Sequence, residues 1–134
     1  MTRQEDGSVL FAVYGTLRRG HANHSHCLKG VSEFLGELKT EPNYKMVGKG
    51  RGFPFVAEGG STPITVEIYR VKDEAVVKRV NGLEGYSGIR GSANNWYDTC
   101  DIETPWGKAN MFINNQYSNA TTGLIETGDW NNQD

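Results

Sequence analysis

The sequence predicts a mixed α+β fold, in which a small, curved or barrel-like β-sheet carries one or two short helices. Three observations support this prediction: an uncharged run from Ser8 to Tyr14, an alternating segment from Ile64 to Val71, and an apolar stripe at helical spacing from Asp73 to Leu83. The chain has 134 residues, a length typical of one domain. We therefore expect a single domain covering residues 1–134.

The first predicted strand ends in a glycine turn. The residues from Ser8 to Tyr14 are mostly β-branched, aromatic or small, as in a strand buried on both faces. Gly15 permits either a positive φ or a close approach of the backbone to a ligand, and Gly20 closes the turn. Asn23 is then a suitable N-cap for a short helix from His24 to Leu28. Backbone N–H groups in such a turn lack strand partners, so they can bind an anion or a developing oxyanion.

The middle of the chain contains mainly strand patterns. Segments 31–40 and 44–47 predict short strands, and residues 53–57 lead into a glycine turn. Segment 64–71 gives the clearest alternation, with Ile64, Val66 and Ile68 on one face and Thr65, Glu67 and Tyr69 on the other. We expect the first face to lie in the core and the second to line a pocket.

A helix and a hairpin are predicted in the second half. Asp73 can cap a helix whose apolar stripe consists of Val76, Val77, Val80 and Leu83, and Gly82 favours its end. Glu84 follows at the helix exit, where a carboxylate can point inward. The polar, glycine-rich loop 86–95 has the length and composition of a mobile lid. Segments 97–103 and 108–113 predict two strands joined by a turn at 105–107.

Composition argues against several classes of partner. The net charge of −2 provides no broad basic field, so neither nucleic acid nor an anionic membrane is an expected partner. No segment approaches the ~20 apolar residues of a membrane span, and the N-terminus lacks the apolar core of a secretion signal. Cys27 and Cys100 form no CxxC pair, which suits free thiols in a reducing compartment. We expect a cytoplasmic monomer or homodimer.

The glycine turn also carries a family resemblance. The residues Tyr14-Gly15-Thr16-Leu17-Arg18-Arg19-Gly20, followed by Asn23-His24, resemble the opening signature of the γ-glutamyl cyclotransferase-like proteins, especially the γ-glutamylamine cyclotransferase branch. Later stretches that resemble family segments occur in the family's order: Gly52-Phe53-Pro54-Phe55-Val56, Val66-Glu67-Ile68-Tyr69-Arg70-Val71, Leu83-Glu84-Gly85 and Gly128-Asp129-Trp130. The resemblance covers most of the chain.

The resemblance implies a specific reaction and site. The substrate's free α-amine would attack its own γ-carbonyl, releasing 5-oxoproline and an amine from a γ-glutamyl amine or amide. Glu84, in the Leu-Glu-Gly position, would carry both protons as general acid and base, so neither a metal nor a cofactor is required. Tyr14, Gly15, Thr16 and Leu17 would bind the substrate carboxylate and the oxyanion, with Tyr14 also lining the pocket. Together with Phe53, Tyr69 and Tyr86, Tyr14 would desolvate Glu84 and raise its pKa.

Other interpretations of these residues stay open. Glu67 and, less strongly, Glu58 compete with Glu84 for the role of general base, although a strand glutamate is usually a surface or cross-strand partner. Arg18 and Arg19 either attract an anionic substrate or are simply solvated. The histidines at 21, 24 and 26 suggest zinc, but helical spacing does not place all three on one face.

Two other functions stay open as well. Tyr97 is followed by Asp98 and Thr99, whereas the family's pattern has an arginine two residues after the tyrosine, so a positive charge beside the substrate is missing. The chain could therefore be a small-molecule binding module that keeps the pocket without turnover. It could also be an interaction protein with a vestigial pocket.

Overall fold

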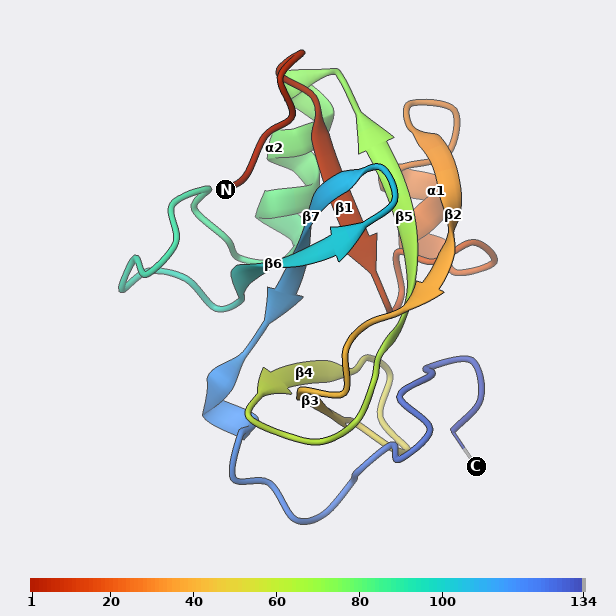
Figure 1. Cartoon of the computed structure of the whole chain (residues 1–134), viewed down its shortest axis with the longest axis vertical. Helices are drawn as coiled ribbons and strands as arrows, with labels where there is room; N and C mark the ends of the chain where they lie inside the picture. Colours follow the sequence, from red (N-terminus) through yellow and green to blue (C-terminus); the bar gives the residue numbers. More distant parts are fainter. Residues whose placement is uncertain (134) are drawn as a thin grey trace.

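The computed structural model describes residues 1–133, in which seven strands, two α-helices and one 3₁₀ turn follow one another (Figure 1). In chain order the elements are β1 (Val9–Val13), α1 (Ala22–Cys27), β2 (Glu33–Lys39), β3 (Tyr44–Val47), β4 (Phe55–Glu58), β5 (Thr65–Val71), α2 (Glu74–Leu83), β6 (Asp98–Thr104), β7 (Gly107–Ile113) and η1 (Asn115–Tyr117). The predicted α+β fold, with a small sheet and two short helices, is confirmed.

The strands form two sheets. Five strands are ordered β2-β5-β1-β7-β6, and β3 and β4 form a separate antiparallel pair. Neighbouring strands of the larger sheet are antiparallel except β1 and β7, which are parallel. Strand β1 is therefore central, and the loop that leaves its C-terminal end emerges from the middle of the sheet (Figure 1).

Strand β1 is buried on both faces, as its uncharged sequence predicts. On one face, Val9, Phe11 and Val13 pack with residues of α1 and α2. On the other face, Leu10 and Ala12 pack with β3, β4 and the C-terminal segment. None of the five β1 side chains is more than 2% exposed. The molecule thus has one hydrophobic cluster on each side of the sheet, and β1 belongs to both.

The two helices begin differently from one another. Asp73 caps α2 as predicted, because its carboxylate accepts a hydrogen bond of 2.9 Å from the N–H of Ala75. The prediction that Asn23 caps the first helix is wrong. The N-cap of α1 is His21, and Asn23 lies inside the helix, where its amide donates to the Thr16 hydroxyl at 2.8 Å.

Strand β5 is buried on both faces, which differs from the expectation of one core face and one pocket face. Ile68 lies in the core beneath β3 and β4, while Tyr69 packs on the opposite side with the helices. Neither of the two helices meets the length and hydropathy of a membrane span, and residues 1–133 contain no other candidate.

Candidate functional site

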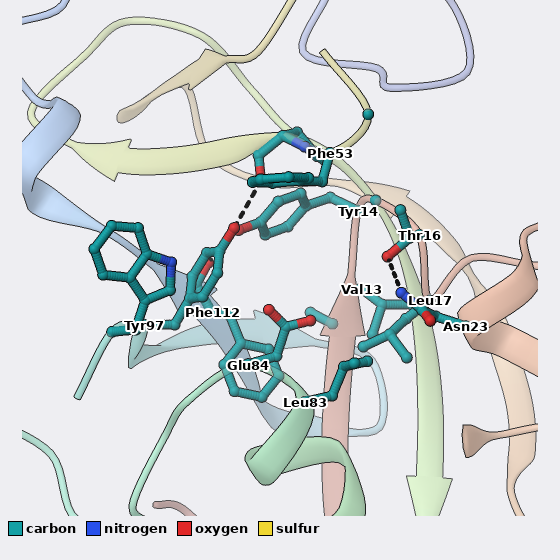
Figure 2. A pocket seen from close by; sticks show the side chains of 15 residues that line it. Val13, Tyr14, Thr16, Leu17, Asn23, Phe53, Leu83, Glu84, Tyr97 and Phe112 are labelled. Atoms are coloured by element: carbon teal, nitrogen blue, oxygen red, sulfur yellow. Dashed lines mark hydrogen bonds between the residues drawn. The ribbon is translucent and has the colours of Figure 1, made fainter. Parts of the chain in front are cut away.

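A cavity of about 390 Å³ opens between the loop after β1 and the end of α2 (Figure 2). Its wall is completed by the segments just before β4 and just before β6. Its lining is mostly apolar or aromatic, with Glu84 as the one charged side chain among the described residues: Ala12, Val13, Tyr14, Gly15, Thr16, Leu17, Asn23, Gly52, Phe53, Pro54, Leu83, Glu84, Trp96, Tyr97 and Phe112. A concave, apolar site with a few polar groups is typical of small-molecule binding.

The loop of residues 15–17, here called the Gly15 loop, presents unpaired N–H groups. Three of its acceptors are occupied: the carbonyl of Gly15 by the N–H of Arg18, the Thr16 hydroxyl by Asn23, and the carbonyl of Leu17 by the His24 ring at 3.0 Å. By contrast, the N–H groups of Gly15, Thr16 and Leu17 have no acceptor among residues 1–133. Three consecutive N–H groups without partners can receive an anionic ligand.

Gly15 is required by a close approach to the opposite wall rather than by a positive φ. A Cβ atom at this position would lie 2.8 Å from Cγ and 2.9 Å from Cδ of Pro54. The proline ring packs against the loop where any side chain on residue 15 would stand. The glycine therefore brings the wall before β4 into contact with the Gly15 loop.

Gly15→Ala is accordingly expected to separate these two walls. We expect an overpacking cost of about 1–3 kcal/mol in the free energy of unfolding and weaker ligand binding. Chemical denaturation measures the first effect, and a binding titration measures the second. Gly52→Ala is the control, because a Cβ atom there meets nothing within 4 Å. Equal stability of the two variants would show that the contact with Pro54 does not constrain the loop.

The carboxylate of Glu84 points into the cavity (Figure 2). It has no hydrogen-bond partner among residues 1–133, and burial raises the pKa of Glu84 to about 7. A carboxyl group with this pKa exchanges its proton near neutral pH, so it can act as either acid or base there.

The backbone around Glu84 is held from both sides. Glu84 follows α2 directly, and its N–H donates to the carbonyl of Val80 at 3.3 Å. Its carbonyl accepts from the N–H of Tyr97 at 3.3 Å, and the carbonyl of Gly85 accepts from Trp96 at 2.9 Å. These bonds bring the segment just before β6 beside the end of α2 and hold the backbone of Glu84 at the cavity.

Two tyrosine hydroxyls are tied to the cavity wall. Tyr14 donates to the carbonyl of Phe112 at 2.8 Å, and Tyr97 donates to the carbonyl of Pro54 at 2.8 Å. Burial, reinforced by the Glu84 charge, raises the pKa of both phenols far above the ordinary value. Both tyrosines are therefore neutral and serve to shape the cavity.

The structure brings most of the predicted site residues together. Tyr14, Gly15, Thr16, Leu17, Phe53 and Glu84 all line the cavity. Tyr69 and Tyr86 do not, and their predicted place in the pocket is corrected. The Tyr69 hydroxyl donates to Glu67 at 2.8 Å and the Tyr86 hydroxyl accepts from Thr99 at 3.0 Å, so both are committed to the interior.

Several lining residues were not predicted from the sequence. Asn23, Trp96, Tyr97 and Phe112 reach the cavity from α1, the segment before β6, and β7. Trp96 is 49% exposed and lines the cavity beside the half-exposed Phe53 and Leu83. These residues carry no signal in the sequence, because their position at the cavity depends on how distant segments pack.

The loop 86–95 does not cover the cavity. Its Arg90 donates to Thr99 and forms an ion pair of 2.7 Å with Asp101, which fixes the loop beside β6. None of residues 86–95 belongs to the cavity lining. The predicted lid therefore lies beside another part of the sheet in this conformation.

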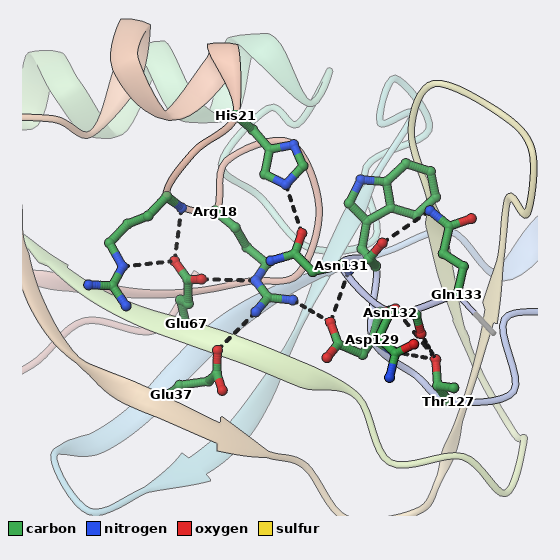
Figure 3. A network of polar contacts seen from close by, with 11 residues as sticks. Arg18, His21, Glu37, Glu67, Thr127, Asp129, Asn131, Asn132 and Gln133 are labelled. Carbon is green, nitrogen blue, oxygen red and sulfur yellow. Dashed lines mark hydrogen bonds and ion pairs between the residues drawn. The ribbon is translucent and has the colours of Figure 1, made fainter.

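Glu67 and Arg18 form a buried polar cluster instead of a solvated surface (Figure 3). Each is 3% exposed, and Glu67 accepts hydrogen bonds from Arg18, from the N–H of Arg19 and from Tyr69. Burial alone would raise the pKa of Glu67, but these hydrogen bonds outweigh it and hold the pKa below its ordinary value. Glu67 thus has the properties of a permanent anion, not of a proton shuttle.

The remaining candidates have other partners. Glu58 accepts a hydrogen bond from the Asn115 amide at 3.0 Å and does not line the cavity that contains Glu84. His21 bonds to Asn131, and His24 bonds to the carbonyl of Leu17. Within residues 1–133, no group of three His, Cys, Asp or Glu side chains is placed to hold a metal ion.

Comparison with known proteins gives a consistent result. The family model described as "Gamma-glutamyl cyclotransferase, AIG2-like" matches residues 11–132. A Vibrio cholerae protein named "putative gamma-glutamylcyclotransferase" is 34% identical over 121 residues, which cover 90% of this chain and 94% of that protein.

Solved structures share the fold. The crystal structure of an uncharacterized protein from Pyrococcus horikoshii matches with a TM-score of 0.69 and 30% identity, covering 92% of this chain and 90% of that one. An AIG2-like protein from mouse also gives a TM-score of 0.69, at 22% identity, covering 91% of this chain and 87% of that one.

Proposed function

Because this chain belongs to the γ-glutamyl cyclotransferase, AIG2-like family, we propose that it converts a γ-glutamyl amine or amide into 5-oxoproline and a free amine. One observation carries the proposal: an unpaired carboxylate, Glu84, shares one cavity with the three unpaired N–H groups of the Gly15 loop. An acid–base group and an anion site on one cavity are the two elements that this cyclisation needs. No cofactor enters the reaction.

The Gly15 loop binds the negative charges of the reaction. Its N–H groups hold the α-carboxylate of the γ-glutamyl moiety and the oxyanion that forms at the γ-carbonyl. The low polarity of the surrounding side chains strengthens these interactions, because no charged side chain other than Glu84 lines the described cavity. Binding both ends of the γ-glutamyl chain brings the α-amine toward the γ-carbonyl.

Glu84 moves the protons. As a carboxylate it removes a proton from the substrate ammonium, which frees the amine to attack the γ-carbonyl. As a carboxylic acid it then donates that proton to the departing nitrogen as the C–N bond breaks. The attacking nitrogen loses a second proton when it becomes the lactam N–H, and Glu84, again a carboxylate, accepts it. The departing amine takes up this second proton and leaves as an ammonium ion, which returns Glu84 to its starting state.

The leaving amine lies at the cavity mouth. Three lining residues there are apolar and about half exposed: Phe53 at 52%, Leu83 at 45% and Trp96 at 49%. The described lining contains no Lys, Arg or His that could pair with a carboxylate on the leaving group. This environment favours an amine with a hydrocarbon chain over an amino acid.

A matched pair of substrates tests this proposal. γ-Glutamyl-isopentylamide and γ-glutamyl-leucine differ only in the carboxylate of the leaving group. We expect 5-oxoproline from the first, with kcat/KM at least about tenfold higher than for the second, because desolvating an unpaired carboxylate at the mouth is costly. Product is quantified by chromatography with purified chain.

The other outcomes separate the alternatives. Thermal stabilisation by these compounds without 5-oxoproline would identify a binding module and contradict the enzymatic proposal. Neither stabilisation nor product would favour an interaction protein. Equal turnover of both compounds would keep the cyclotransferase but reject the apolar mouth as its selective element.

A further inference from the structure

We propose that Arg18 and Asp129 are positioning residues for the Gly15 loop, so that the C-terminal segment of residues 127–132 forms part of the support of the binding site. The proposal rests on the proposed function, because it assigns these residues to the anion site of that reaction. It concerns a side-chain cluster that lies behind the cavity and none of whose members lines it.

Arg18 joins three separate parts of the molecule. Its Nε donates to Glu67 of β5 at 2.9 Å, Nη1 to Asp129 at 2.7 Å, and Nη2 to Glu37 of β2 at 2.9 Å (Figure 3). Each of the three guanidinium nitrogens therefore donates a hydrogen bond to a carboxylate. The side chains of Arg18 and Glu67 are both 4% exposed, so the bond between them lies away from bulk water and is screened little, whereas Asp129 and Glu37 are 27% and 52% exposed.

The cluster compensates an unfavourable strand pairing. Glu37 and Glu67 are direct cross-strand partners in β2 and β5, where two like charges repel. Arg18 binds both of them, and a planar guanidinium with several donors fits this role better than a lysine. The two carboxylates thus bind Arg18, the residue that follows the Gly15 loop, at a fixed position on the sheet.

The backbone is held at the same place. Glu67 accepts a 3.0 Å hydrogen bond from the N–H of Arg19, and the N–H of Arg18 bonds to the carbonyl of Gly15 at 3.0 Å. Glu67 is also the register partner of Val13, the last residue of β1. The two ends of the Gly15 loop are consequently fixed to one residue of β5, which sets the direction of the free N–H groups.

Asp129 extends this arrangement to the C-terminal segment. The segment is anchored beside β5, since the carbonyl of Gly128 accepts from the N–H of Thr65 at 2.9 Å. Gly128 has a φ of +66°, and a Cβ atom there would collide with the carbonyl oxygen of Pro63. Asn131 adds a second link, because its side-chain oxygen bonds to His21 at 2.8 Å. The segment is therefore in a defined position from which Asp129 can hold Arg18.

Asp129→Asn is the principal test, because it removes the charge while keeping the shape and an acceptor oxygen. We expect KM for the γ-glutamyl substrate to rise about tenfold, since small displacements of binding groups have large effects. The pH at which kcat is half-maximal should not change, because Glu84 lies outside the cluster. Arg18→Lys, which keeps the charge but loses the fork, should show the same increase in KM.

The control is Arg70→Met, which breaks the 2.8 Å ion pair with Glu33 on the same two strands but away from the loop. Its KM should stay within twofold of the wild type. If Asp129→Asn and Arg18→Lys are folded by circular dichroism and also keep KM within twofold, the positioning role is wrong.

Amide hydrogen exchange gives a readout that does not require activity. We expect the N–H groups of Arg18 and Arg19 to exchange at least about tenfold faster in Asp129→Asn than in the wild type, and unchanged in Arg70→Met. Unchanged exchange in Asp129→Asn would overturn the inference even if the wild type makes 5-oxoproline. Faster exchange in a chain that makes no 5-oxoproline would reject the proposed function and leave the coupling of the C-terminal segment to the loop.

Discussion

Glu84→Gln is expected to lower kcat by about 10²–10⁴-fold. The amide keeps the size of the side chain but cannot take the proton from the substrate ammonium. Substrate affinity should change little, because the anion site is formed by the Gly15 loop on another element. Initial rates of 5-oxoproline formation and a binding titration with a slowly reacting substrate measure the two effects.

Stability separates a chemical effect from unfolding. Burial raises the pKa of Glu84 to about 7, so between its ordinary value and pH 7 the folded chain binds a proton that the unfolded chain does not. The contribution of this group to stability therefore falls as pH rises through that range. Glu84→Gln should be at least as stable as the wild type at pH 8. A less stable variant would indicate that the carboxylate has a structural role.

Arg18→Met is expected to cause the largest loss of stability, about 3–5 kcal/mol in the free energy of unfolding at pH 7. The substitution leaves Glu67 buried without its cation, with Glu37 opposite it in the sheet and Asp129 nearby. Urea denaturation measures the loss. Arg70→Met breaks an ion pair in which the Glu33 side chain is 60% exposed. This substitution should change the free energy of unfolding by less than about 1 kcal/mol.

The loss of stability caused by Arg18→Met should depend on pH. In the wild type the pKa of Glu67 is held low, so its contribution is present above the ordinary glutamate pKa and is lost as pH falls through its value in the folded chain. In the variant the unpaired carboxyl group is easier to bury once protonated. The difference between the two proteins should therefore shrink from pH 7 toward pH 4. A difference that grows on acidification would contradict the buried ion cluster.

The sequence is most informative where local chemistry decides the structure. The uncharged residues of β1 predicted a strand buried on both faces, and Asp73 predicted the start of α2. The placement of Glu84 at the helix exit beside a pocket also follows from local pattern together with the family resemblance. The burial of β1, the start of α2 and the position of Glu84 at the helix exit depend on residues that are neighbours along the chain.

The errors concern residues whose environment is created by distant segments. Arg18 resembles a solvated arginine until Glu67, Glu37 and Asp129 are brought around it by strand pairing and by the C-terminal segment. The alternation of β5 predicts that Tyr69 lies on a pocket face, but α1 and α2 cover that face. Asn23 is a residue type that favours the N-cap position, yet its side chain donates to the hydroxyl of Thr16, seven residues earlier in the chain.

The most direct test of the account is the pH dependence of kcat/KM for wild-type chain on a γ-glutamyl amide, compared with the titration of Glu84 followed by NMR of ¹³C-labelled glutamate. A general base acts only when ionised, so the account predicts an acidic limb with an apparent pKa of about 7 that coincides with the Glu84 titration. The limb should be absent from the residual activity of Glu84→Gln. An acidic limb that persists unchanged in this variant, or a Glu84 pKa at the ordinary glutamate value, would contradict the assignment of Glu84 as the proton shuttle.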